Sequence, residues 1–177
     1  MYDIAILEWL QSHKIPNSIS VLQFISSTTT MISISIALTI LIISILKRSK
    51  IFLRHFFVLA IVLILVLVVS QGLKASIFRN RTFVDHPHIE KLSDAGSSSF
   101  PSGHTMEAFA VAAALTMLFP RRKIFIPIYL WAVLVAYSRM ALGVHYPSDI
   151  AGGIVIGTFL GLIVPSLFRR FARRSTS

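Results

Sequence analysis

The chain has 177 residues, of which 55% are hydrophobic and 14% are charged, and its mean hydropathy is +0.77. A soluble domain of this size could not bury so much apolar surface, so the composition predicts one membrane-embedded domain spanning residues 1–177. The absence of cysteine excludes disulfides, thiolate catalysis and cysteine-based metal sites. The net charge of +10 lies in short clusters between apolar segments, as in membrane anchors. No basic stripe with interleaved aromatic residues is present, so we expect no nucleic-acid partner.

The first segment with a recognisable pattern runs from Tyr2 to Gln11. Its apolar side chains at Ile4, Leu7 and Leu10 alternate with polar ones at helical spacing. This pattern predicts a short amphipathic helix lying in the membrane interface, although a frayed terminus fits almost as well.

Five apolar segments follow, each long enough or nearly so to cross a hydrocarbon core that needs about 20 residues. They indicate an all-α fold, a polytopic membrane helical bundle of about five transmembrane helices plus the N-terminal interfacial helix. The segments are residues 26–46, 52–73, 105–119, 124–142 and 150–168.

Basic residues predict how this bundle is oriented. With five spans, eleven of the seventeen Lys and Arg residues fall on one side, which the positive-inside tendency assigns to the cytoplasm. The C-terminus then lies in the cytoplasm, whereas the N-terminus and the loop over residues 73–101 face outward. These eleven residues are Lys47, Arg48, Lys50, Arg54, Arg121, Arg122, Lys123, Arg169, Arg170, Arg173 and Arg174.

Three glycines, Gly153, Gly157 and Gly161, recur every four residues in the last apolar segment. Small residues at this spacing let another helix approach closely, so they predict a packing face. The partner helix could belong to the same chain or to a second copy, and we include a homo-oligomer through this face among the expectations.

Polar residues from separate parts of the chain all map to the outer side of the predicted bundle. Membrane helices rarely carry so many polar groups without a functional reason, which favours a single site. The candidates are Lys74, Arg81, Ser102, Gly103, His104, Arg139, His145 and Asp149.

Two short motifs among these residues predict an anion site. Pro101 to His104 reads as the start of a helix, with Ser102 as N-cap and Gly103 allowing close approach of a ligand to the backbone. The first N–H groups of a helix favour an anion such as a phosphoryl group. Asp149 follows His145 by four residues, about one helical turn, so its carboxylate can reach the imidazole.

This arrangement is typical of phosphoryl-transfer chemistry. Asp149 would hold one ring nitrogen of His145 as N–H and leave the other as a nucleophile, while His104 protonates the departing oxygen. Three cations, Lys74, Arg81 and Arg139, would neutralise the phosphoryl oxygens. Each residue alone also has a structural interpretation, such as a snorkelling lysine or an interfacial histidine. One shared site explains them together. Glu107 could line that site or only pack, and we favour packing.

The motifs resemble the three-part signature of the type 2 phosphatidic acid phosphatase family, which is related to vanadium haloperoxidases. Lys74 and Arg81 match the first part, a Lys, six residues and Arg-Pro, except that Thr82 replaces the proline. The second part, Pro-Ser-Gly-His, is complete at residues 101–104. The third part is complete at Ser138, Arg139, His145 and Asp149. The match covers about residues 74–160, and the change at Thr82 concerns the shape of the loop more than its charge.

The resemblance implies a helical bundle with a metal-independent site at its outer rim. His145 would become a phosphohistidine oriented by Asp149, and His104 would be the general acid. Lys74, Arg81, Ser102, Gly103 and Arg139 would bind phosphate. No cofactor is expected. Asp85, His86, His88 and Glu90 look like metal ligands, but Pro87 interrupts them, and an exposed lid is the favoured interpretation.

The leading functional hypothesis is therefore a lipid phosphatase of a bacterial inner membrane, with its active site facing outward. Candidate substrates, by resemblance, are undecaprenyl diphosphate, lipid A 1-phosphate, phosphatidylglycerol phosphate and phosphatidic acid, with a preference for the first two classes. Two alternatives use the same residues. A lipid phosphotransferase would pass the phosphoryl group to another acceptor, and a non-catalytic binder or transporter would need only the cations.

Overall fold

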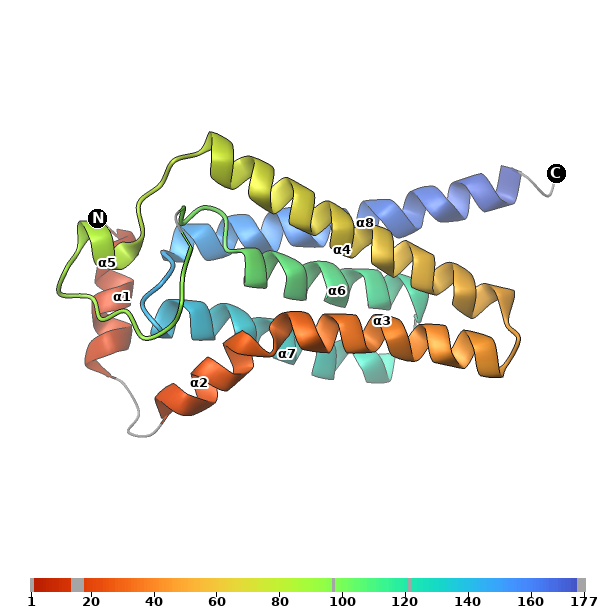
Figure 1. Ribbon diagram of the computed structural model, residues 1–177, viewed down its shortest axis with the longest axis horizontal. Helices are drawn as coiled ribbons and strands as arrows, with labels where there is room; N and C mark the ends of the chain where they lie inside the picture. Colours follow the sequence, from red (N-terminus) through yellow and green to blue (C-terminus); the bar gives the residue numbers. More distant parts are fainter. Residues whose placement is uncertain (1, 14–17, 97, 121, 175–177) are drawn as a thin grey trace.

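The computed structural model describes residues 2–13, 18–96, 98–120 and 122–174, and over these residues it contains helices and no strand. The five longer helices run side by side as an elongated bundle, whereas the short helices α1, α2 and α5 lie toward one end of it (Figure 1). The prediction of an all-α membrane bundle is confirmed. The elements are α1 Tyr2–Ser12, α2 Ser18–Ser27, α3 Thr29–Leu46, α4 Lys50–Ser76, α5 Thr82–Asp85, α6 Gly103–Leu118, α7 Arg122–Ala141 and α8 Pro147–Arg174.

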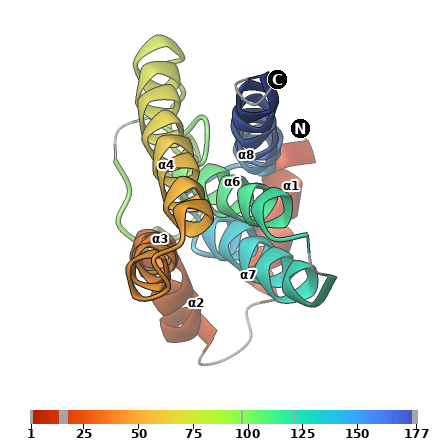
Figure 2. The same cartoon turned by 90° about the vertical axis from the view of Figure 1, so that its right-hand side faces the viewer.

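Three of the five long helices, α3, α4 and α8, are long and apolar enough to cross a membrane. The apolar stretch of α7 is shorter, and α6 has only 16 residues. Viewed along the bundle, α6 lies in the centre, and it contacts α3, α4, α7 and α8 (Figure 2). A helix that is surrounded by other helices does not face lipid, so its length need not match the hydrocarbon core.

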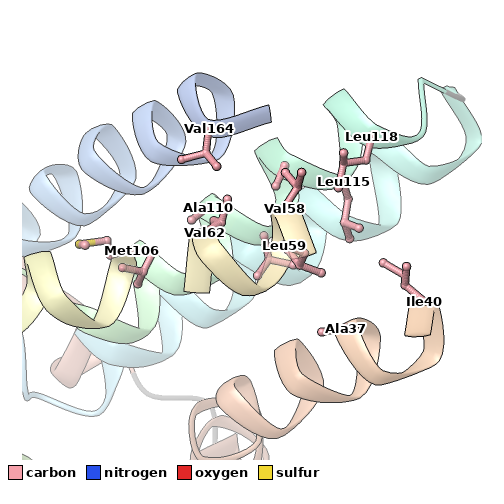
Figure 3. Packing of buried hydrophobic residues seen from close by; sticks show 13 residues of the cluster. Ala37, Ile40, Val58, Leu59, Val62, Met106, Ala110, Leu115, Leu118 and Val164 are labelled. Atoms are coloured by element: carbon pink, nitrogen blue, oxygen red, sulfur yellow. The ribbon is translucent and has the colours of Figure 1, made fainter. Parts of the chain in front are cut away.

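The core forms mainly between α4 and α6. Val58, Leu59 and Val62 of α4 are buried against Met106 and Ala110 of α6 (Figure 3). On α6 the run Ala112–Ala113–Ala114 is fully buried, and such small side chains let neighbouring helices come close. In contrast, large apolar side chains of α3 and α4 remain exposed on the outside of the bundle, where lipid would cover them. They include Ile34, Leu38, Ile42, Ile64, Leu67 and Val68.

The glycine face of α8 packs against α6 of the same chain. A Cβ atom added to Gly157 would lie 2.2 Å from the carbonyl oxygen of Met106, and one added to Gly161 would lie 2.4 Å from that of Ala110. Gly153, Gly157 and Gly161 are all buried. The prediction of a packing face is thus confirmed, and α6 of the same chain is the helix that occupies it, whereas the homo-oligomer stays a prediction.

The bundle has a basic end and an opposite end that carries the signature motifs. The α3–α4 turn and the end of α8 lie together at one end, far from α1 and α5 (Figure 1). Lys47, Arg48 and Arg169 belong to this basic end. Arg121 lies outside the described residues, as do the side chains of Arg122, Arg173 and Arg174.

Candidate active site

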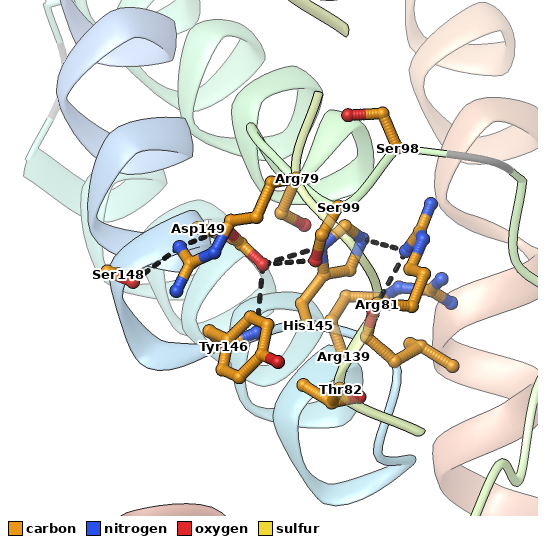
Figure 4. A network of polar contacts seen from close by, with 12 residues as sticks. Arg79, Arg81, Thr82, Ser98, Ser99, Arg139, His145, Tyr146, Ser148 and Asp149 are labelled. Carbon is orange, nitrogen blue, oxygen red and sulfur yellow. Dashed lines mark hydrogen bonds and ion pairs between the residues drawn. The ribbon is translucent and has the colours of Figure 1, made fainter. Parts of the chain in front are cut away.

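The predicted site residues come from the ends of five helices and the segments beside them. Lys74 lies in the last turn of α4, Arg139 in the last turn of α7 and Asp149 in the first turn of α8. Arg81 precedes α5, and Ser102 is the N-cap of α6. Because these ends meet at one end of the bundle, residues far apart in the sequence come close in space (Figure 4).

His145 lies in the turn between α7 and α8, and its side chain is buried. Gly143 makes this turn with φ +69°, a left-handed conformation that favours glycine. The Nε2 atom of His145 lies 2.9 Å from Nη1 of Arg81, and Nδ1 lies 3.4 Å from Oδ2 of Asp149. A guanidinium only donates hydrogen bonds, so Nε2 must carry a lone pair and Nδ1 the proton. The geometry therefore favours the tautomer that makes Nε2 a nucleophile.

The environment keeps this imidazole neutral. Burial lowers the pKa of His145 to about 3, and the neighbouring Arg81 and Arg139 act in the same direction, whereas the contact with Asp149 raises it. A ring that is neutral at physiological pH has a lone pair on Nε2, which accepts the hydrogen bond from Arg81 in this structure.

The carboxylate of Asp149 is fully buried and surrounded by donors. Oδ2 accepts hydrogen bonds from the Ser99 hydroxyl and from the backbone N–H of Tyr146, 2.9 Å away, and Oδ1 accepts one from Arg79 at 2.7 Å (Figure 4). Sequence reasoning missed Arg79 and Ser99. Arg79 is an additional arginine two residues before Arg81, and this was the only local signal for it.

Arg81 is a buried cation directly beside the candidate nucleophile. Besides contacting His145, it donates to the backbone carbonyls of Gly96 and Val144 at 3.1 and 2.8 Å. These bonds fix the guanidinium on the loop and on the α7–α8 turn at once. Lys74 lies near enough to Arg81 for the two positive charges to repel each other. The Nζ atom of Lys74 also lies near Gly103, since a Cβ atom added to that glycine would be 3.7 Å from it.

Arg139 is also buried, and its side chain is bound by residues of α2 and of the loop before α6. Its guanidinium donates to the hydroxyls of Ser26 and Ser93 and to the carbonyl oxygen of Asp94. The Nε atom is buried without a hydrogen-bond partner. An unpaired buried donor is costly, so this N–H is suited to an anionic ligand.

The start of α6 differs in one detail from the prediction. Ser102 occupies the N-cap position, but its hydroxyl contacts the Thr105 hydroxyl at 2.9 Å and does not cap the helix. Its backbone N–H donates to the carbonyl oxygen of Asp149 at 3.2 Å, which links α6 to α8. The first N–H groups of α6 have no acceptor within the helix and can receive an anion.

Two cavities meet at His104. The first is an apolar groove of about 460 Å³ between α3, α4 and α6, and the second is a more polar hollow of about 370 Å³ beside Arg139. Glu107 lines the groove and accepts a hydrogen bond from Thr30 at 2.8 Å, so it does more than pack. The groove is lined by Thr30, Ile34, Leu63, Ile64, Val66, Leu67, Ser70, Gln71, Lys74, Gly103, His104 and Glu107, and the hollow by Gln23, Phe24, Ser26, Ser27, Ser93, Asp94, His104 and Arg139.

Residues 55–173 match the family model of the PAP2 superfamily. The chain belongs to this superfamily. The resemblance inferred from Lys74, Arg81, residues 101–104 and the third motif is thereby confirmed.

Individual PAP2 proteins are similar to this chain over part of their length. An undecaprenyl-diphosphatase, BcrC of Bacillus subtilis, is 37% identical over 106 residues, which are 60% of this chain and 52% of the relative. A lipid A 4'-phosphatase of Bacteroides thetaiotaomicron is 38% identical over 82 residues, or 46% and 36% of the two chains. The chain thus spans about half or less of these relatives' length.

The fold has a solved counterpart within the PAP2 group. The crystal structure of a PAP2-type phosphatidylglycerolphosphate phosphatase from Bacillus subtilis superposes with a TM-score of 0.79 at 25% sequence identity. The alignment covers 96% of this chain and 85% of the other. The match thus extends over almost all of the present chain.

Thr82, which departs from the PAP2 signature, has a role of its own. Its side chain is fully buried, and its hydroxyl donates a hydrogen bond to the carbonyl oxygen of Gly143. Proline could not make this bond. The substitution therefore adds a link between the loop that carries Arg81 and the turn that carries His145.

The residues that resemble metal ligands do not converge. Asp85 accepts hydrogen bonds from Asn80 and from the Tyr146 hydroxyl, and His88 contacts Glu8 on α1 at 2.8 Å. Within the described ranges, no group of three His, Cys, Asp or Glu side chains is arranged to hold a metal ion. These loop residues instead join the loop to α1 and to the turn before α8.

Proposed function

We propose that this chain is an integral membrane lipid phosphatase that removes the terminal phosphate of a lipid phosphate or diphosphate through a phosphohistidine on His145. One observation carries the proposal. A neutral imidazole presents its Nε2 lone pair beside the Arg81 guanidinium, in a cation cluster that adjoins an apolar groove ending at His104. Cations suit a phosphoryl group, and the groove suits the tail of its lipid.

The reaction has two displacements at phosphorus. In the first, Nε2 of His145 attacks, and the bond from phosphorus to the lipid oxygen breaks. His104 acts as the imidazolium, protonated when the anionic substrate is bound, and gives its proton to that oxygen. Asp149 stabilises the N–H on Nδ1 as the ring becomes cationic. In the second, His104 takes a proton from water, the water oxygen bonds to phosphorus, and the P–N bond breaks to release inorganic phosphate.

Charge neutralisation is the main demand of both steps, because the transferred group spreads negative charge over three oxygens. Arginine matches this group with a planar fork of donors, and helix N–H groups add to it. We assign this role to Lys74, Arg81, Arg139 and the start of α6 at Ser102 and Gly103. The site needs no cofactor or metal ion in this mechanism.

The two cavities support a substrate that is both apolar and polar. The groove is bordered by side chains that are exposed on the outside of the bundle, such as Ile64 and Leu67, so a tail can enter from the bilayer. The hollow beyond His104 leaves room for a polar part of the departing lipid. Candidates are undecaprenyl diphosphate, lipid A phosphates, phosphatidylglycerol phosphate and phosphatidic acid, and relatives are named for activity on the first three.

The proposed location is a bacterial inner membrane, with the active site outside and the C-terminus in the cytoplasm. It is supported by the basic residues at the end of the bundle opposite the signature motifs. A reporter that is active only in the cytoplasm should be active when it is fused after Ser177. Activity of a reporter that works only in the periplasm, fused at the same point, would overturn the orientation.

The activity is tested with the purified chain, EDTA and a panel of these lipids, with phosphate release as the readout. We expect release from at least one lipid, and a loss of about 10³-fold or more in kcat for His145→Ala. His13→Ala, which changes an exposed histidine directly after α1, is the matched control and should keep full activity. Full activity of the His145 variant would refute the nucleophile. Oxygen from labelled water should appear in the phosphate, whereas a phosphorylated acceptor without it would indicate a transferase.

A further inference from the structure

The two carboxylate oxygens of Asp149 have different partners. Oδ2 faces the ring of His145 and also accepts from Ser99 and from the N–H of Tyr146. Oδ1 is bound by Nη1 of Arg79 at 2.7 Å, a contact from outside the signature. With one oxygen fixed by Arg79, the plane of the carboxylate is set, and the other oxygen is kept toward the imidazole.

Arg79 is itself held in place by the first residues of the chain. Its Nη2 atom lies 3.0 Å from Oδ2 of Asp3 on α1, and its Nη1 atom also donates to the Ser148 hydroxyl at 2.7 Å. The guanidinium lies over the ring of Tyr146, 4.1 Å from the centroid. Asp3 in turn accepts from the backbone N–H of Ser148 at 3.1 Å, at the start of α8. The carboxylate of Asp3 thus fixes both Arg79 and the helix end that carries Asp149.

Asp3 is ionised in this position. Its partial burial raises the pKa, but the hydrogen bonds from Ser148 and Arg79 and the charge of Arg79 outweigh burial and hold the pKa of Asp3 below its ordinary value. The result is a row of alternating charges, Asp3, Arg79 and Asp149, that leads from α1 to the candidate nucleophile.

Helix α1 is docked firmly enough to hold Asp3. Leu7 is fully buried in a small core with Ile89 and Tyr146. Gln11 exchanges two hydrogen bonds of 3.0 Å with the backbone N–H and C=O of Glu90. These contacts bind α1 to the loop and to the turn before α8. The opposite face of α1 exposes Trp9, as expected for a helix at the membrane interface.

We propose that Arg79 and Asp3 are positioning residues for the Asp149–His145 pair, so that helix α1 is a functional part of the active site. The inference rests on the proposed phosphatase activity. When Nε2 of His145 takes up the phosphoryl group, the ring becomes a cation whose Nδ1–H must meet a correctly turned carboxylate. Without Arg79, that carboxylate loses the partner of one oxygen and can rotate away.

The experiment compares Arg79→Gln, Arg79→Lys and Asp3→Asn, with dioctanoyl phosphatidic acid and farnesyl diphosphate in micelles as probes. Outer partners of metal ligands typically contribute about 10- to 100-fold, and we take the same range for the partner of a catalytic carboxylate. We therefore expect Arg79→Gln to lower kcat by that factor while KM changes by less than about threefold. Asp3→Asn should lower kcat by roughly 3- to 10-fold, and Arg79→Lys should recover part of the loss.

A double-mutant cycle distinguishes a relay, in which Asp3 acts through Arg79 on Asp149, from two substitutions that lower activity independently of each other. Because Asp3 acts partly through Arg79 and partly through its own bonds to Ser148, adding Asp3→Asn to Arg79→Gln should lower kcat by a clearly smaller factor than Asp3→Asn does in the parent. The side chains of Arg79 and Asp3 are about a third exposed, 31% and 32%, so these variants should fold, with melting temperatures near that of the parent. Glu8→Gln is the matched control, because Glu8 lies on α1 but contacts His88 outside the relay.

Two results would overturn the relay. One is a folded Arg79→Gln variant with kcat within twofold of the parent, and the other is a fully additive double variant. Failure of the proposed function looks different, because the parent chain would then release no phosphate from any lipid of the panel. If Arg79→Gln does not fold, Asp3→Asn and Arg79→Lys carry the same test.

Discussion

The close contact between α6 and α8 can be probed with one methyl group. In Gly157→Ala, the new Cβ would lie 2.2 Å from the carbonyl oxygen of Met106, 2.9 Å from its carbonyl carbon and 3.0 Å from its Cα. All three atoms belong to the backbone of α6, so no side chain can rotate to make room. The two helices would have to separate.

The size of the effect follows from these distances. Contacts of a Cβ below 3.0 Å are essentially never seen, so α6 and α8 must move apart by almost 1 Å, roughly the shortfall from 2.2 Å. Overpacking of this kind costs about 1–3 kcal/mol, and the upper part of the range applies where only backbone can yield. Replacing glycine by alanine within a helix returns about 1 kcal/mol. We therefore expect Gly157→Ala to lower the free energy of unfolding by about 2 kcal/mol.

Gly72→Ala is the matched control. Gly72 lies inside α4, and a Cβ added there would have no atom within 4 Å, so only the helix-propensity gain of about 1 kcal/mol remains. The two variants should differ by about 3 kcal/mol, or roughly 6–12 °C in melting temperature for a chain of this size. Tryptophan fluorescence during heating in detergent measures this difference. Equal melting temperatures would refute the packing argument. Phosphate release should also fall only in Gly157→Ala, because α6 carries His104.

Three further outcomes are expected. The pKa of His145 in the folded chain lies below its value in the unfolded chain, so the folded chain binds fewer protons and its stability falls as the pH drops from about 6.5 toward 3. Between pH 7 and pH 5 the free energy of unfolding should fall by about 2 kcal/mol. His145→Asn should remove this part of the pH-dependent change in melting temperature. Thr82→Val leaves the buried carbonyl of Gly143 without its donor and should cost about 1–3 kcal/mol in chemical unfolding, whereas an unchanged midpoint would contradict that bond. Leu67→Trp should narrow the groove and raise the KM for long-tailed lipids by about tenfold or more, but not the KM for dioctanoyl phosphatidic acid. The control is Val68→Trp, because Val68 is exposed on the same helix but lies outside the groove. Equal KM values for the two variants would argue against a lipid tail in the groove.

Much of the helical framework could be predicted because hydropathy in a membrane chain depends on local sequence alone. The predicted segment 105–119 corresponds to α6, and 52–73 lies within α4. The missed boundary lies near Thr28, where α2 ends and α3 begins. The Thr28 hydroxyl donates to the carbonyl oxygen of Phe24 at 2.7 Å, a back-bond of the kind that bends helices. Hydropathy is insensitive to such a bond, so the predicted span began inside α2.

The site was predictable to the extent that its contacts are local. His145 and Asp149 are four residues apart, and their spacing already indicated a contact. The contacts of Arg79 with Asp149 and with Asp3 cross 70 and 76 residues, and no periodicity or motif encodes them. The partner of the glycine face was likewise undetermined, because close approach depends on the glycines alone and not on which helix supplies the other surface.

The start of α6 and the start of α8, which carry His104 and Asp149, are joined directly to each other. Ser102, at the start of α6, donates its N–H to the carbonyl of Asp149 on α8, and Gly153 one turn further packs its backbone against the same stretch of α6. The spacing between His104 and the His145–Asp149 pair is therefore set by the contact between two helices and by the bonds that join their ends. Helix packing is far stiffer than loop structure, and catalytic groups tolerate errors of well under 1 Å. A methyl group at Gly157, about two turns from Asp149, should consequently disturb catalysis as well as stability, and it would do so without touching any polar atom of the site.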